Sequence, residues 1–134
     1  MIPDAMPPAS RSSLRPSLRR RLDQVGIGLA GLCAVHCLAT LVVISALGLG
    51  GHFFLFDPAI HRIGLALAFA VAAVAIGWGL LRHGRLLPFA IALGGLALMT
   101  AALVIPHGAN EFLLTLAGVA LVSVGHLLNL RAAR

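Results

Sequence analysis

Long uncharged segments alternate with short polar ones along most of the chain. The uncharged segments cover residues 24–56, 63–81, 86–110 and 112–130. A helix that rises about 1.5 Å per residue needs about 20 mainly apolar residues to cross roughly 30 Å of hydrocarbon. Each segment can therefore hold one crossing, and the pattern predicts four membrane-spanning helices.

Residues with strong turn and capping preferences set the limits of these helices. Clustered glycines at positions 48, 50 and 51 end the first helix, while Asp57 and Pro58 suit the cap and first turn of the second. We predict an all-α membrane protein, a four-helix transmembrane bundle made of two helical hairpins. The predicted spans are about 25–47, 59–81, 87–105 and 111–130.

The composition agrees with this class of protein. Of the 134 residues, 60% are hydrophobic and only 10% are charged, whereas a soluble domain has about 25% charged residues. The first apolar run is also much longer than the core of a cleaved signal peptide, which is about 7–15 residues. The lipid bilayer is therefore the expected environment of the chain.

The arginines are distributed unevenly between the two sides of the predicted topology. All ten basic residues are arginines, and only Arg62 falls on the side opposite to the other nine. Short arginine-rich segments stay cytoplasmic. We therefore predict a multi-pass protein of the bacterial inner (plasma) membrane with both termini in the cytoplasm. Retention of arginines in the cytoplasm also explains the basic N-terminal segment, so a nucleic acid is not an expected partner.

Composition also distinguishes the N-terminal segment and the small-residue faces of two spans. Residues 1–22 contain prolines, serines and arginines without an apolar stretch, which predicts a disordered basic cytoplasmic arm before a four-span domain at 23–131. Small residues let helices approach closely in lipid. We expect such packing at a small-residue face of span two and at a glycine pair in span three: Gly64, Ala68, Ala72, Ala75 and Gly79, and Gly94 with Gly95.

Both cysteines of the chain lie in the segment Cys33-Ala34-Val35-His36-Cys37 of span one. At about 100° per residue, Cys33, His36 and Cys37 project within about a third of the helix circumference. Thiolates favour soft or borderline ions such as Hg(II), Cu(I) and Zn(II), and ionisable residues within spans usually face the bundle interior. We predict a metal site here, with no organic cofactor and no enzymatic activity. The alternative is that the cysteines act as small buried hydrophobic residues.

Histidines and an acidic residue elsewhere extend the candidate site. By helical rise His126 of span four lies about one turn from the depth of Cys33, so we predict it as a further ligand; a hydrogen bond to a neighbouring helix is the alternative. Four residues near the outer loops could collect an incoming cation: His52, His61, His107 and Glu111. Ordinary loop and helix-terminus roles explain them equally well.

The chain resembles the MerC family of mercury-resistance inner-membrane proteins over nearly all of residues 22–131. The resemblance rests on the four compact spans, the arginine-rich arm, the sequence GLCAVHCLAT at 31–40 and the sequence GHLLNL at 125–130. It implies uptake of mercuric ion across the bacterial inner membrane. It also implies a cytoplasmic partner, either a metal-accepting thiol protein or a reductase.

Two features depart from the best-known mercury transporters and keep other functions open. Those proteins carry Cys-x-x-Cys in the membrane and a second cysteine pair in a cytoplasmic tail, whereas this sequence has one more residue between Cys33 and Cys37 and no later cysteine. Zinc or copper could therefore be the cargo. A bis-histidine haem protein using His36 and His126 would also fit the pattern, as would a structural membrane subunit without cargo. Because four short helices leave little room for a pore, a homo-oligomer is also expected.

Overall fold

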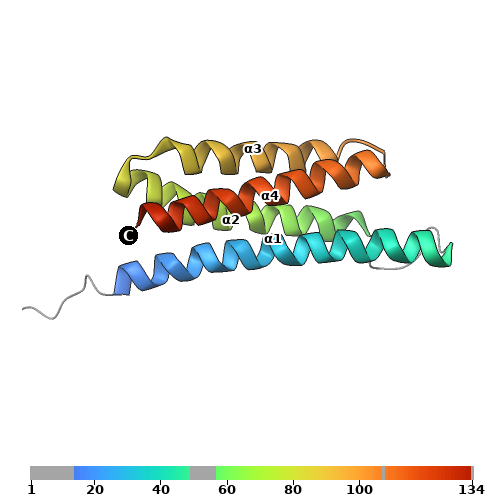
Figure 1. Cartoon of the computed structure of the whole chain (residues 1–134), viewed down its shortest axis with the longest axis horizontal. Helices are drawn as coiled ribbons and strands as arrows, with labels where there is room; N and C mark the ends of the chain where they lie inside the picture. The colour runs from blue at the N-terminus through green and yellow to red at the C-terminus, as the bar shows by residue number, and fades with distance from the viewer. Residues whose placement is uncertain (1–13, 49–56, 107, 134) are drawn as a thin grey trace, which may run out of the picture.

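Four helices that lie alongside one another form a bundle (Figure 1). A computed structural model describes residues 14–48, 57–106 and 108–133. Its helices are α1 (Leu14–Leu47), α2 (Pro58–His83), α3 (Leu86–Ala102) and α4 (Ala109–Ala132), and no strand occurs among these described residues. The prediction of an all-α membrane bundle is confirmed. By length and composition α1, α2 and α4 can each cross a membrane, and α3 is apolar but shorter, with 17 residues.

Helix α1 is longer than the predicted first span. It has 34 residues and begins at Leu14, so residues 14–22 of the predicted arm are helical, while residues 1–13 lie outside the described part of the chain. The guanidinium of Arg19 donates a hydrogen bond of 2.9 Å to the backbone carbonyl of Asn129 near the end of α4. A cation at a helix C-terminus is favourable because the last carbonyls lack helical partners. This contact holds the start of α1 against the bundle.

The helix ends follow local sequence signals. Asp57 caps α2, because its Oδ1 accepts a hydrogen bond of 2.8 Å from the Ala59 amide, and Pro58 occupies the first helical position. Gly84 ends α2 with φ 65°, a left-handed conformation that glycine adopts without strain. Helix α3 ends at Ala102, a turn before the predicted limit at residue 105. The chain turns there because the residue before Pro106 is disfavoured in a helix.

Glycines of α3 and α4 bring the backbones of these two helices close together. A Cβ on Gly95 would lie 2.6 Å from the carbonyl oxygen of Gly118, and one on Gly118 would lie 2.7 Å from the carbonyl oxygen of Gly95. A Cβ on Gly94 would meet nothing within 4 Å. Of the predicted glycine pair, only Gly95 therefore mediates helix packing. On α2, the predicted small-residue face is buried at Ala72 and Ala75.

The outward surface of the bundle is apolar. Large hydrophobic side chains are exposed along all four helices, for example Leu32 of α1, Leu81 of α2, Leu86 of α3 and Leu113 of α4. In lipid this arrangement is stable, because each helix satisfies its own backbone hydrogen bonds and its apolar side chains face hydrocarbon. The bilayer therefore provides the solvent for this surface.

The two adjacent glycines of α3 offer a matched test of this packing. We expect Gly95→Ala to lower the free energy of unfolding by about 1–3 kcal/mol, because the new methyl group forces the α3 and α4 backbones apart. Gly94→Ala should leave stability equal or raise it by up to about 1 kcal/mol, because alanine is the better helix former. Thermal unfolding of both variants in detergent measures the difference. Equal effects would contradict the proposed close approach.

Candidate metal site

The two thiols lie one helical turn apart on the same face of α1. Cys33 and Cys37 are free and half-buried, and their side chains interact with each other. Cys33 also packs against the hydrophobic core of the bundle. Thiols that stand at positions i and i+4 of a helix can therefore approach one ion from the same side.

A histidine of α2 lies beside Cys37. The Nε2 atom of His61 is 3.5 Å from Cys37 Sγ, and the ring of His61 meets the ring of His36 edge to face, with centroids 5.4 Å apart and an interplanar angle of 68°. Figure 1 shows that α1 extends past the start of α2, which brings the first turn of α2 level with the thiols. Residues of two helices thus converge around Cys37.

A cavity of about 450 Å³ lies between α1 and α2 and reaches residues of α3 and α4. Its lining is apolar except for four side chains: Cys33, His36, His61 and His126. The Nε2 atoms of His36 and His126 are buried and have no hydrogen-bond partner among the described residues. The polar groups of this cavity are therefore those that bind thiophilic or borderline metals.

His126 lies at the far end of this cavity, away from the thiols. Its side chain is 1% exposed, and its ring fills the space where a Cβ of Gly26 would stand. Gly26 precedes Cys33 by seven residues of the same helix, which is about 10 Å of helical rise. The described arrangement therefore does not bring His126 to the cysteines. Gly26 precedes His36 by ten residues, about 15 Å of helical rise, so His126 and His36 lie too far apart along α1 to bind one haem iron.

A buried hydrogen-bond network accounts for the position of His126. The Asp23 carboxylate of α1 accepts bonds from His126 Nδ1 at 2.8 Å and from Asn129 Nδ2 at 3.0 and 3.1 Å. Asn129 Nδ2 also donates to the carbonyl of Ala75 in α2, at 3.1 Å. Asp23 and Asn129 are 0% exposed, so this network joins α1, α2 and α4 inside the bundle.

His83 extends this network toward the turn between α2 and α3. The Arg85 amide donates to His83 Nδ1 at 3.1 Å, so the proton of a neutral ring is on Nε2, which donates to Asn129 Oδ1 at 2.9 Å. The amide orientation of Asn129 is fixed by the same contacts, with its oxygen toward His83 and its nitrogen toward Asp23. His83 is thus part of the buried network and not only a residue of the turn.

Of the remaining predicted residues, the structure describes Glu111, at the start of α4. Glu111 is half-buried in the first turn of α4, close enough to Cys37 for an electrostatic interaction. His52 and His107 lie outside the described residues. Within the described ranges, no three His, Cys, Asp or Glu side chains are already gathered around one point as a metal cluster.

Two of these contacts are not predicted from the sequence alone. The sequence places His61 only near the outer loops, because it does not show how far α1 runs past the start of α2. It also places Asp23 only at the start of span one. His126 and Asn129, three residues apart on span four, form a polar pair that needs a buried partner, and this spacing is the signal that could identify Asp23.

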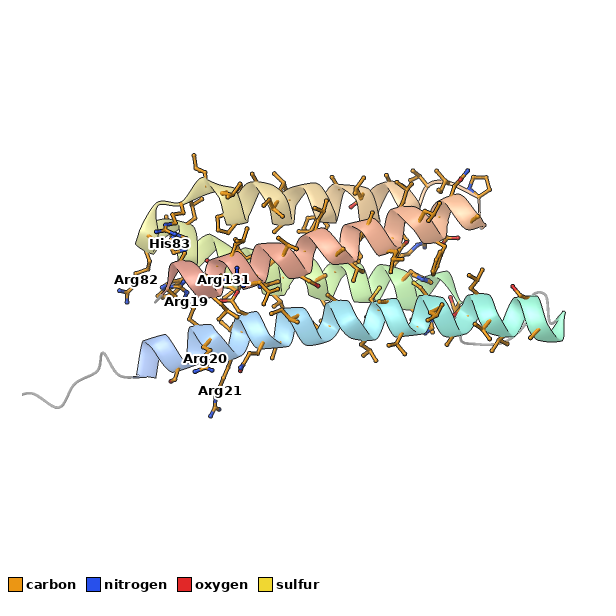
Figure 2. All side chains as sticks on the ribbon, in the orientation of Figure 1. Arg19, Arg20, Arg21, Arg82, His83 and Arg131 are labelled. Atoms are coloured by element: carbon orange, nitrogen blue, oxygen red, sulfur yellow. The ribbon has the colours of Figure 1, made fainter. Side chains whose placement is uncertain are left out.

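Most of the described arginines gather at one end of the bundle, and Arg62, at the start of α2, is the exception. Figure 2 shows Arg19, Arg20 and Arg21 at the start of α1 together with Arg82 and Arg131 at the ends of α2 and α4. Cys37 and His61 lie toward the opposite end of the helices. The arginine asymmetry of the sequence therefore corresponds to one end of the folded bundle.

These features define a class of protein, a small helical membrane bundle with thiol and imidazole groups inside it. The sequence model of the MerC mercury resistance protein family matches residues 23–131, which is more than half of the chain. The chain belongs to this family. No curated protein and no solved structure matches the sequence.

The buried carboxylate makes a strong prediction for stability. Asp23→Ala should lower the free energy of unfolding by about 3–5 kcal/mol, because His126 and Asn129 then lose their buried acceptor. Gln24→Ala, at the exposed neighbouring position, should change it by less than about 0.5 kcal/mol. Unfolding of both variants in detergent tests this, and a similar small effect of both would contradict the role of Asp23.

Proposed function

We propose that this protein carries a thiophilic metal ion, with mercuric ion as the first candidate, across the bacterial inner membrane. In this proposal Cys33 and Cys37 bind the ion and His36 assists from the same stretch of α1. The observation that carries the proposal is a thiol pair next to a cavity inside a membrane bundle, in a chain of the mercury resistance family. Zinc and copper are the alternative cargoes, because they share the same ligand preferences.

Two thiols can bind a divalent ion inside an apolar bundle without leaving a net charge there. When Hg(II) binds, each thiol loses its proton and forms a sulfur–metal bond, so two protons leave and the bound complex carries no net charge. A neutral complex avoids most of the cost of burying a charge in an apolar environment. Two protonated thiols are neutral as well, so the exchange of two protons for one divalent ion leaves the charge of the site unchanged.

The cavity suggests the direction in which the bound ion could move. Glu111 and His61 lie toward the outer ends of the helices, and His126 lies at the inner end of the cavity. With Asp23 on Nδ1, the Nε2 atom of His126 is the nitrogen left for a metal, an arrangement that is common in histidine metal sites. We propose His126 as a later contact of the ion after the cysteines. Release to a cytoplasmic thiol protein or reductase, and assembly as a homo-oligomer, stay predictions from the sequence.

The cysteines provide the direct test. We expect the detergent-solubilised protein to bind one Hg(II) ion with release of about two protons, because the thiols ionise on binding. The double variant Cys33→Ser with Cys37→Ser should lose this binding, and vesicles that contain it should lose Hg(II) uptake. Isothermal titration in two buffers of different ionisation enthalpy gives the proton count.

A serine on another face of α1 controls for the added hydroxyl groups. Ala39→Ser, at an exposed position, should keep both Hg(II) binding and uptake. Unchanged binding in the double serine variant would remove the cysteines from the site. Retained binding with no uptake by the wild-type protein in vesicles would make the protein a metal-binding subunit and not a carrier.

The arginine distribution supports one orientation of the protein in the membrane. We propose that the arginine-rich end shown in Figure 2 faces the cytoplasm, because basic residues next to spans are retained on that side. An alkaline phosphatase reporter fused after Arg85 should be inactive, and one fused after Gly108 should be active, because this enzyme folds only outside the cytoplasm. The reverse pattern would overturn both the orientation and the direction of the proposed path.

A further inference from the structure

We propose that His61 of α2 is a direct ligand of the transported ion, so that the ion is held between α1 and α2 by Cys37, His61 and Cys33. This inference rests on the proposed function, because it assumes that the cysteines bind a metal. It differs from the sequence-based prediction, in which the nitrogen from another helix was His126 of α4.

The distance between the two nearest atoms fits a shared metal. In a tetrahedral zinc site, a sulfur at about 2.3 Å and a nitrogen at about 2.05 Å from the metal are about 3.6 Å apart. Cys37 Sγ and His61 Nε2 are 3.5 Å apart. A metal could therefore replace the hydrogen between these atoms without moving either helix.

The surrounding residues hold His61 in this position. It stands in the first turn of α2, whose start is fixed by the Asp57 cap, and its ring rests against the ring of His36. A ligand on a capped helix is placed more accurately than one on a loop. His36 thus positions His61 in addition to lying next to the thiols.

Cys33 supplies the third ligand and completes the charge balance. It lines the same cavity as His61 and interacts with Cys37. A divalent ion that binds two thiolates and one neutral imidazole forms a neutral complex, with the two thiol protons released to water. In this proposal Cys37 and His61 are already in contact. A rotation of the Cys33 side chain would bring its sulfur, the third ligand, to the same ion.

A histidine ligand from α2 should affect the binding of some metal ions more than that of others. Hg(II) is satisfied by two thiolates, whereas Zn(II) and its spectroscopic substitute Co(II) favour four ligands, including nitrogen. Loss of His61 should therefore affect zinc and cobalt much more than mercury. A residue that serves only in packing would not separate these ions.

The experiment compares two replacements of His61 in the full-length protein in detergent. His61→Gln keeps a polar group next to Cys37 but is a poor ligand, and we expect it to weaken Zn(II) binding by about 10- to 100-fold and Hg(II) binding by less than about threefold. His61→Cys restores a ligand, so Zn(II) binding should return, and the Co(II) complex should gain thiolate-to-metal absorption. Titration calorimetry and the Co(II) spectrum provide the two measurements.

Controls separate this inference from the proposed function. Arg62→Gln, at the exposed adjacent position, should bind all three ions as the wild type does. Zn(II) affinity unchanged in His61→Gln, or equal losses of Zn(II) and Hg(II) in both His61 variants, would assign His61 to packing and overturn the inference. Wild-type protein that binds no Hg(II), or binding that survives in the double serine variant, would instead overturn the proposed function.

Discussion

The carboxylate of Asp23 has to be satisfied inside a bundle that excludes water, and this requirement organises the other helices. An unpaired buried charge is too costly to persist, so Asn129 and His126 of α4 must lie where they can donate to it. Asn129 in turn reaches the backbone of α2 at Ala75. The register of α1 against α4 is thereby set near the arginine-rich end. Because a helix is rigid over this length, the same register determines the depth of the thiols further along α1.

The bundle has one closely packed side and one more open side. On the close side, the backbones of Gly95 and Gly118 touch, leaving no space for a side chain between α3 and α4. On the open side, a Cβ on Gly64 would meet nothing within 4 Å, and this residue lines the cavity between α1 and α2. Small residues therefore serve two opposite purposes here. They bring two helices together in one half and leave room beside the thiols in the other.

The sequence predicted the number and kind of elements well, because hydrophobic length, the Asp57 cap and the turn at Gly84 are local signals. It could not predict the relative depth of residues on different helices. Counting from the expected start of span one placed His126 one turn from Cys33, but α1 begins earlier, at Leu14, and His126 packs at Gly26. The end of α1 matches the prediction, but α1 runs past the start of α2, so that His61 lies level with Cys37. Depth across a bundle depends on side-chain contacts between helices, which no single span reveals.

Two different solutions to the problem of polar groups in a membrane are present in one small protein. Around Asp23 the polar groups satisfy one another permanently, and the result is a fixed connection among three helices. Around Cys37, thiol and imidazole groups lie in loose contact, with a buried nitrogen of His36 that has no partner in the described structure. The proposed ligands around Cys37 therefore do not form strong bonds to one another. A site used for transport needs this property, because the ion must be able both to bind and to leave.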